Sequence, residues 1–395
     1  MVIDLTWVLL VLPLTFLLGW LASRFDLRQL RIENRQAPKA YFKGLNYLLN
    51  EQQDEAIDAF IEAVQRDPDT SELHFALGNL FRRRGEYERA VRVHEHLLSR
   101  GDLSATDRDR AQYALALDYL KAGLLDRAET ALLKLDGTAH EARARLALLA
   151  IYERSHDWVQ AARVAQMLDG SGQGSFTARI AHYLCEQAAT QLATQQPETA
   201  LQTYTLAMSV EPAAARPRIE LAKLLVVKGD PHGACDTLLE AMSAAPAAVP
   251  LIAPLLAQFA LAAGRAPAAL AGLQACYDAS PSLDVLEALV QLQTGRGAVT
   301  NDKIANADGL TTARDWYLRH LEREPSLVAA AKWIAGEKLE HEQFHPQVQR
   351  ALDHAVKPLT RYRCAACGFE ATQHFWQCPG CQTWDSYSAR RVEEL

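Results

Sequence analysis

The stretch GLNYLLNEQQDEAIDAFIEAVQRDP, residues 44–68, has the residue pattern of two short helices joined by a tight turn. Small and aromatic residues occur in it at helical spacing, and a proline closes it; these positions are Gly44, Tyr47, Ala56, Phe60, Ala63 and Pro68. Small residues let two antiparallel helices approach closely, aromatic residues fill the space toward the next pair, and proline ends the second helix. The stretch therefore predicts one helix pair that packs against a following pair.

Similar stretches recur through the middle of the chain. Each contains an alanine after a short polar turn, in most cases with an aromatic residue or leucine four positions later; these are Ala56, Ala90, Ala128, Ala161, Ala200, Ala234 and Ala269. Their spacings are 34, 38, 33, 39, 34 and 35 residues, which bracket the tetratricopeptide period of about 34 residues. We expect an all-α fold in which residues 39–282 form seven helix pairs, stacked into a right-handed superhelix.

The pattern weakens after residue 282. We expect Leu283–Leu292 to begin a degenerate eighth repeat, residues 294–310 to form a loop, and helices to resume over 311–323 and 326–339. Residues 283–358 are thus predicted to form a degenerate repeat and further helices. A helical solenoid offers a concave face that binds peptides or protein surfaces, and catalytic groups have no natural point of convergence in it. The repeats predict a binding scaffold and not an enzyme.

A basic cluster lies on the predicted inner face of the second and third repeats. The positions concerned are Asn79, Arg82 and Arg83, with Arg84 adjoining, and Lys121 in the third repeat. An acidic segment of a partner protein could dock there. The alternative is that this basic run is simply a solvated helix face.

Four of the seven cysteines lie close together near the C-terminus, in RYRCAACGFEATQHFWQCPGCQTW, residues 361–384. Cys364, Cys367, Cys378 and Cys381 have the spacing C-x2-C-x10-C-x2-C. Two tight turns of this kind supply four thiolates to one tetrahedral ion, which is either zinc or iron. We expect residues 359–390 to form a metal module that is too small to fold without its ion.

The neighbours of these cysteines resemble the two knuckles of rubredoxin. Gly368 permits the positive φ that closes the first turn, and Pro379 stiffens the second. Gln382 stands where the second rubredoxin knuckle usually carries glycine, and the module is shorter than an electron-transfer rubredoxin. Four aromatic residues are predicted to form the module's only core: Phe369, Phe375, Trp376 and Trp384. Two alternatives to a metal site are disulfide bonds and a thioredoxin-type redox pair. A reducing compartment disfavours the disulfides, and the lack of a βαβ setting disfavours the redox pair.

The N-terminus predicts a membrane anchor. Residues 5–22, LTWVLLVLPLTFLLGWLA, carry no charge and are long enough to cross a hydrocarbon core of about 30 Å. Five basic residues follow, which places the C-terminal side in the cytoplasm: Arg24, Arg28, Arg31, Arg35 and Lys39. A cleaved signal peptide would instead need a basic residue before the apolar run. We therefore expect residues 1–23 to anchor the chain in the inner membrane and residues 24–38 to form a basic juxtamembrane segment. The N-terminus would then be periplasmic and the body of the protein cytoplasmic.

The composition fits this arrangement. The 395-residue chain has a formal net charge of −7 and 49% hydrophobic residues, so no global positive field exists to attract nucleic acid. The three remaining cysteines, Cys185, Cys235 and Cys276, lie singly in alanine- and leucine-rich segments and are predicted to be small buried hydrophobes. Scattered thiols beside one tight cluster favour a reducing compartment with a single metal site.

An anchor, a run of tetratricopeptide repeats and a terminal pair of rubredoxin-like knuckles, in this order, resemble the lipopolysaccharide assembly protein B family of Gram-negative inner membranes over essentially the full chain. The resemblance implies a non-enzymatic adaptor that helps the membrane-bound protease FtsH degrade LpxC, the lipid A deacetylase, and so limits lipopolysaccharide synthesis. It also implies that Cys364, Cys367, Cys378 and Cys381 hold the metal and that their module packs against the repeats.

Two other functions fit the same residues. In the first, the knuckles are the centre of an electron-transfer or metal-sensing protein, and the repeats are its docking arm. In the second, the chain is a scaffold for envelope-assembly enzymes that acts without proteolysis. A homo-oligomer is compatible with all three hypotheses.

Overall fold

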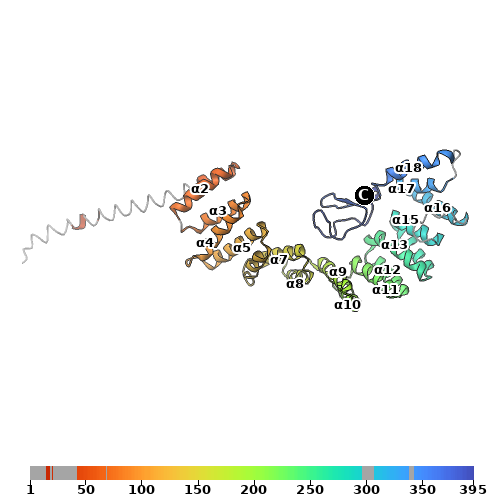
Figure 1. Cartoon of the computed structure of the whole chain (residues 1–395), viewed down its shortest axis with the longest axis horizontal. Coiled ribbons are helices and arrows are strands. Elements are labelled where there is room, and N and C mark those ends of the chain that lie inside the picture. Colours follow the sequence, from red (N-terminus) through yellow and green to blue (C-terminus); the bar gives the residue numbers. More distant parts are fainter. Residues whose placement is uncertain (1–14, 18–19, 21–41, 68, 296–306, 338–341) are drawn as a thin grey trace, which may run out of the picture. The chain divides into compact units, whose positions relative to one another are not determined.

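The computed structural model describes residues 15–17, 20, 42–67, 69–295, 307–337 and 342–395 (Figure 1). The predicted juxtamembrane segment, nearly all of the predicted anchor and Pro68 lie outside these residues. Within the described ranges no single helix is long and apolar enough to cross a membrane, and one pair bent by 118°, Pro231–Ala244 with Pro246–Ala262, meets the length and composition criteria jointly. The chain divides into two compact units, Met1–Ser155 and His156–Leu395.

Unit 1 consists of antiparallel helices that pack in chain order. Residues 42–49 are helical, and the helices that follow are α2 (Gln53–Arg66), α3 (Ser71–Arg84), α4 (Tyr87–Ser99), α5 (Ala105–Lys121), α6 (Leu125–Leu133) and α7 (Glu141–Ser155). Each of them packs on its neighbour in the sequence. Because the contacts are local, this unit has the one-dimensional architecture expected of stacked repeats.

Unit 2 continues the same helical pattern and ends in a small ribbon. Its helices are α8 (Trp158–Asp169), α9 (Thr177–Ala193), α10 (Pro197–Val210), α11 (Ala215–Val227), α12 (Pro231–Ala244), α13 (Val249–Ala262), α14 (Ala266–Ala279), α15 (Leu283–Thr294), α16 (Ala307–Arg323), α17 (Leu327–Ala335) and α18 (His345–Val356), with short 3-10 turns η1 (Pro246–Ala248) and η2 (Glu342–Phe344). The ribbon, residues 362–387, contains β1 (Tyr362–Arg363), antiparallel to β2 (Glu370–Ala371), and the turn η3 (Val392–Glu394) follows it.

The predicted repeat register is confirmed by burial. All seven alanines that defined it, from Ala56 to Ala269, are 0% exposed. Each lies in the second helix of its predicted pair. Where both helices of a pair belong to one unit, a larger side chain at this position would force them apart. Gly78 shows how tight such a crossing is, because a Cβ atom built on it would lie 2.5 Å from the ring of His94.

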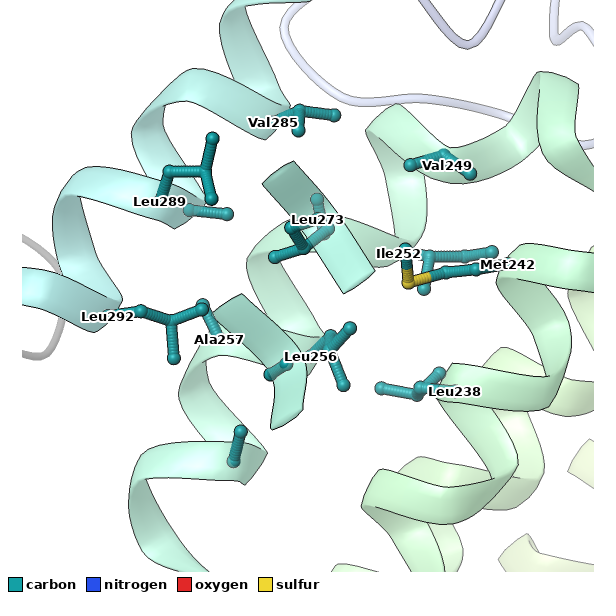
Figure 2. Close-up of a cluster of buried hydrophobic side chains, with 14 of the residues drawn as sticks. Leu238, Met242, Val249, Ile252, Leu256, Ala257, Leu273, Val285, Leu289 and Leu292 are labelled. Atoms are coloured by element: carbon teal, nitrogen blue, oxygen red, sulfur yellow. The ribbon is translucent and has the colours of Figure 1, made fainter. Parts of the chain in front are cut away.

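A large hydrophobic core lies among the described residues of unit 2. Figure 2 shows apolar side chains of α12, α13, α14 and α15 meeting in it, among them Leu238, Ile252, Leu256, Leu273 and Leu289, all fully buried. These helices are rich in alanine, so the leucines of one helix reach between the small residues of the next. Trp376 of the C-terminal ribbon packs against this core.

Two boundaries differ from the sequence-based expectation. Helix α16 begins at Ala307, four residues before the predicted start, because the loop prediction relied on the break in the repeat pattern, and a helix can form without that pattern. Helix α17 ends at Ala335, where Gly336 follows and its backbone N–H bonds to the carbonyl of Trp333. The predicted helix ran to residue 339, which lies outside the described ranges.

Candidate metal centre and its docking surface

The ribbon consists of two knuckles of matching geometry. In the first, the backbone N–H of Gly368 donates to the carbonyl of Cys364 at 2.9 Å, and in the second Gln382 N–H donates to Cys378 at 2.8 Å. Gly368 has a φ of 77° and Gln382 a φ of 61°. Gln382, which departs from the rubredoxin pattern, therefore adopts the same left-handed backbone conformation as Gly368. This conformation is energetically unfavourable for residues with an L side chain.

The structure brings the four predicted ligands together. Their Sγ atoms all lie within 4.8 Å of one another, with Cys364 3.8 Å from Cys381 and Cys367 3.7 Å from Cys378. A tetrahedral ion with metal–sulfur bonds of about 2.3 Å places its sulfurs about 3.8 Å apart, whereas a disulfide needs about 2.05 Å. The sulfur positions thus fit one four-coordinate metal ion and do not fit two disulfides.

Hydroxyl groups contact two of the sulfurs. Ser386 Oγ lies 3.2 Å from the Sγ of Cys364, and Thr383 Oγ1 lies 3.3 Å from the Sγ of Cys381. The Ser386 hydroxyl is the main cause that lowers the pKa of the Cys364 thiol to about 6, and the Thr383 hydroxyl likewise lowers the pKa of Cys381. Both contacts favour the thiolate, which is the form that binds metal.

The ribbon docks onto the first helices of three successive repeats in unit 2. The ring of Trp384 stacks on His182 of α9, with centroids 4.8 Å apart, and the carboxylate of Asp385 accepts from His182 Nε2 at 2.8 Å. Arg216 of α11 lies over the Trp384 ring at 5.9 Å. Leu251 of α13 packs against the ribbon's own small core.

These three repeat residues occupy one equivalent position. His182, Arg216 and Leu251 each precede the buried alanine of their repeat by the same number of residues in the chain. One row along the stacked helices therefore faces the ribbon. In unit 1 the same row holds Glu72, Arg110 and Arg143, and Arg110 bonds to Glu72 through both of its terminal nitrogens.

The aromatic residues do not form an isolated core in the ribbon. Phe369 is 44% exposed, whereas Trp376 packs against the large core of unit 2 and Trp384 against α9. The interior of the ribbon is formed by Tyr362 and Tyr387 around the buried cysteines, with Phe375. A module this small shares its apolar surface with the repeats because it cannot bury enough of its own.

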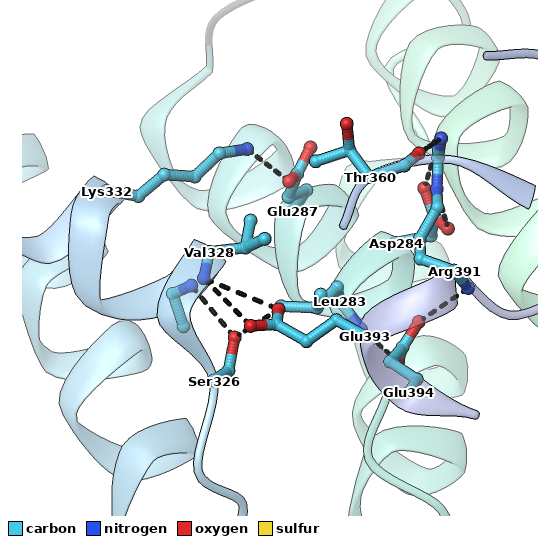
Figure 3. A network of polar contacts seen from close by, with 11 residues as sticks. Leu283, Asp284, Glu287, Ser326, Val328, Lys332, Thr360, Arg391, Glu393 and Glu394 are labelled. Carbon is cyan, nitrogen blue, oxygen red and sulfur yellow. Dashed lines mark hydrogen bonds and ion pairs between the residues drawn. The ribbon is translucent and has the colours of Figure 1, made fainter. Parts of the chain in front are cut away.

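The C-terminal residues fasten the ribbon to α15 and α17 (Figure 3). Arg391 pairs with Asp284 through two bonds of 2.7 and 2.9 Å. Glu393 accepts from the backbone N–H of Val328 at 3.2 Å and from the hydroxyl of Ser326 at 2.9 Å, at the start of α17. Glu394 accepts from Leu283 N–H at 2.9 Å, at the start of α15. The two carboxylates thereby satisfy donors that a helix leaves free at its N-terminus.

The predicted partner-binding residues in unit 1 differ in how far they are exposed to solvent. Arg82 donates to Asp118 at 2.8 Å and to the side-chain oxygen of Asn79 at 2.5 Å, and its side chain is only 18% exposed. Asp118 is fully buried and also contacts His94 Nδ1 at 2.5 Å. Arg83 and Lys121 are exposed. Arg82 and Asn79 are thus part of a buried polar network between α3, α4 and α5, while Arg83 and Lys121 face solvent.

The sequence gives little sign of the residues that hold the ribbon in place. His182 is a single histidine in an apolar helix, and Glu393 and Glu394 look like an ordinary solvated tail. Their partners lie 203, 65 and 111 positions away along the chain. The proximity of Trp384 and Asp385 to the last cysteine was the one available signal that this segment has a special role.

Stacked helix pairs and a four-cysteine ribbon define a tetratricopeptide-repeat protein with a C-terminal metal-binding module. The family of the tetratricopeptide repeat matches residues 40–70, and that of the rubredoxin metal binding domain matches residues 362–388. The chain belongs to the lipopolysaccharide assembly protein B family, as the resemblance predicted. It is 30% identical to lipopolysaccharide assembly protein B of Escherichia coli K12 over 95% of this chain and 96% of that protein.

Two further similarities were found. Lipopolysaccharide assembly protein B of Haemophilus influenzae is 26% identical over 95% of this chain and 96% of its own length. Among solved structures, a tetratricopeptide repeat protein from Parabacteroides merdae is 14% identical, with a TM-score of 0.34, over 65% of this chain and 99% of that one.

Proposed function

We propose that this protein is a non-enzymatic adaptor that limits lipopolysaccharide synthesis by presenting the deacetylase LpxC to the protease FtsH. The observation that carries the proposal is the match over 95% of the chain to a relative named lipopolysaccharide assembly protein B. Stacked helix pairs support it, because such repeats bind protein surfaces and bring partners together.

We further propose that the body of the protein is held at the cytoplasmic face of the inner membrane by residues 1–23. The support is the uncharged run over residues 5–22 and the five basic residues that follow it. A tether confines adaptor and protease to one surface, which raises their effective concentration up to roughly the millimolar range. Anchoring thus strengthens the adaptor without any additional contact.

A pulse-chase of LpxC in cells depleted of this protein tests the adaptor function. We expect the lifetime of LpxC to lengthen and lipopolysaccharide to accumulate on depletion. Expression of the complete chain should restore the normal lifetime of LpxC fully, and expression of residues 24–395 only weakly. An unchanged lifetime after depletion would contradict the adaptor function. Full rescue by residues 24–395 would contradict only the role of the tether.

The exposed basic residues of unit 1 are the proposed contact for an acidic partner segment. Arg83 and Lys121 are suited to a test because neither belongs to the buried network around Arg82. Replacing both with glutamate should weaken capture of LpxC or FtsH from detergent-solubilised membranes. The matched control is the same charge change at Arg92 and Arg127, which lie exposed on the second helices of the same two repeats. Equal capture by both double variants would place the contact elsewhere.

A further inference from the structure

The segment Thr383–Tyr387 links the metal site to the repeats residue by residue. Thr383 and Ser386 contact the sulfurs of Cys381 and Cys364, at 3.3 and 3.2 Å. Between them in the chain, Trp384 and Asp385 contact His182 of α9. Because these four residues are consecutive, the sulfur contacts and the repeat contacts cannot be ordered independently of each other.

The repeat surface under this segment is built to receive it. His182 is 5% exposed, its Nε2 bonds to Asp385, and its Nδ1 faces Arg216 Nη1 at 3.5 Å. The ring of Tyr183, fully buried, meets Trp384 edge-on at 5.8 Å. The surface formed by His182, Tyr183 and Arg216, called here the ribbon-facing surface, thus combines aromatic rings with the ring nitrogen of His182 and the guanidinium of Arg216. It suits an aromatic residue followed by a carboxylate, which is what Trp384 and Asp385 supply.

Without a metal ion, little inside the ribbon holds its two knuckles together. The described ribbon contains one two-residue strand pair and two isolated bridges, Cys364 with Tyr387 and Gln377 with Trp384. For a module of this size, metal-binding free energy is folding free energy. Loss of the metal therefore removes the order that positions Trp384 and Asp385.

The residues after the ribbon are attached to unit 2 by contacts that do not depend on the metal site. Arg391, Glu393 and Glu394 bond to α15 and α17 through contacts that involve no cysteine. The release of Trp384 is therefore local, and the ribbon stays tethered to unit 2 at its other end.

We propose that metal occupancy of the four cysteines controls access to the ribbon-facing surface: the loaded ribbon covers His182, and the metal-free ribbon exposes it. The surface becomes available to a partner segment with an aromatic residue beside a carboxylate only when the metal is absent. This makes the ribbon a metal-dependent cover over part of the repeats.

Chemical modification of histidines by diethyl pyrocarbonate, read out by mass spectrometry on the full chain in detergent, tests the proposal. When a chelator removes the metal, the rate at which His182 is modified should rise about tenfold. The reason is that a loaded ribbon protects His182 only if the covered state is at least about ten times as populated as the open state. Re-addition of the metal should restore protection at one equivalent. His232, which is exposed, calibrates the reagent, and buried His320 reports the integrity of the core.

Two outcomes would overturn the proposal. One is protection of His182 that persists after elemental analysis shows the metal to be gone. The other is a parallel rise at His320, which would mean general unfolding in place of local release. A variant provides an independent test in the loaded protein: Trp384→Ala should expose His182 while one equivalent of metal is retained, and continued protection in that variant would also refute the cover.

Discussion

Arg391 forms a two-pronged ion pair with Asp284, which lies 107 positions earlier in the chain, through bonds of 2.9 and 2.7 Å. The aspartate side chain is 6% exposed and the arginine side chain 23%. Burial raises the pKa of Asp284, and Arg391 acts in the opposite direction. The pair therefore offsets part of the cost of burying a carboxylate at the start of α15, beside the docked ribbon.

Replacing Arg391 with glutamine should destabilise unit 2 by about 3 kcal/mol, because it leaves the Asp284 charge buried without a partner. The double variant Asp284→Asn with Arg391→Gln should recover part of this loss, since neither charge remains. Denaturant unfolding of the four proteins of this cycle measures the coupling. If the changes in unfolding free energy caused by the two single substitutions simply add in the double variant, the interaction between Arg391 and Asp284 contributes nothing to stability.

Replacing Cys364 and Cys367 together with serine should remove the metal and make the ribbon sensitive to protease. A structural site contributes on the order of 10 kcal/mol of binding energy that is also folding energy. Elemental analysis identifies the ion in the parent protein as zinc or iron and measures its loss in the variant. Cys276→Ser is the control, because the Cys276 thiol lies in α14 and is not part of the four-cysteine cluster. Full metal content in the double variant would disprove the ligand assignment.

Gln382→Gly should retain the metal and leave the ribbon at least as stable as the parent, because glycine adopts a φ of 61° without strain. Gln382→Val should destabilise the ribbon, by about 1–2 kcal/mol, since a left-handed conformation is costly for L side chains. Competition with a chelator ranks the three proteins by metal affinity. Equal affinity of the valine and glycine variants would show that the left-handed turn is not needed.

Gly78→Ala should destabilise unit 1 by about 1–3 kcal/mol, as expected for overpacking. The added Cβ would lie 2.5 Å from the His94 ring, and the ring is held by its bond to the buried Asp118. Gly101→Ala is the matched control, because no atom lies within 4 Å of the corresponding position. Thermal unfolding of the two variants should separate them clearly, and equal melting temperatures would contradict the close packing of α3 on α4.

Acid should loosen the ribbon through His374. Burial lowers the pKa of this histidine to about 4, below its unfolded value of about 6.5. The unfolded chain therefore binds more protons between these values, and about 3 kcal/mol of stability is lost as the pH falls from 6.5 to 4. His374→Phe should hold its metal to lower pH than the parent, whereas His354→Phe, at an exposed site on α18, should not. Identical release curves for all three proteins would rule out this contribution.

The repeats could be predicted because their signal is local. An alanine such as Ala200 at a helix crossing is needed in every pair, so its period is visible in the sequence, and burial confirms it. The four ligands were equally visible, since a C-x-x-C turn is set by its own residues. The membrane anchor stays a prediction, because it lies almost entirely outside the described residues.

Long-range pairings could not be predicted. The repeat position of Arg82 predicts a place on the inner face, but the sequence does not show that Asp118 is buried beside it, 36 positions away. The sequence around the cysteines predicts that Trp384 lies in a core inside the ribbon, because the docking site on α9 is encoded by His182 in another part of the chain. Physical proximity of this kind depends on how the repeats stack, which a single sequence does not specify.

The capping of α15 and α17 by Glu394 and Glu393 has a consequence for biosynthesis. Glu394 follows Leu283 by 111 positions in the chain, and Glu393 follows Val328 by 65. Folding begins at the N-terminal side while a chain is still being synthesised, so both helix starts are made well before the carboxylates that cap them. A nascent chain that already carries the helix pairs and the four clustered cysteines, but not yet Glu393, still lacks the contacts that fasten the ribbon to α15 and α17.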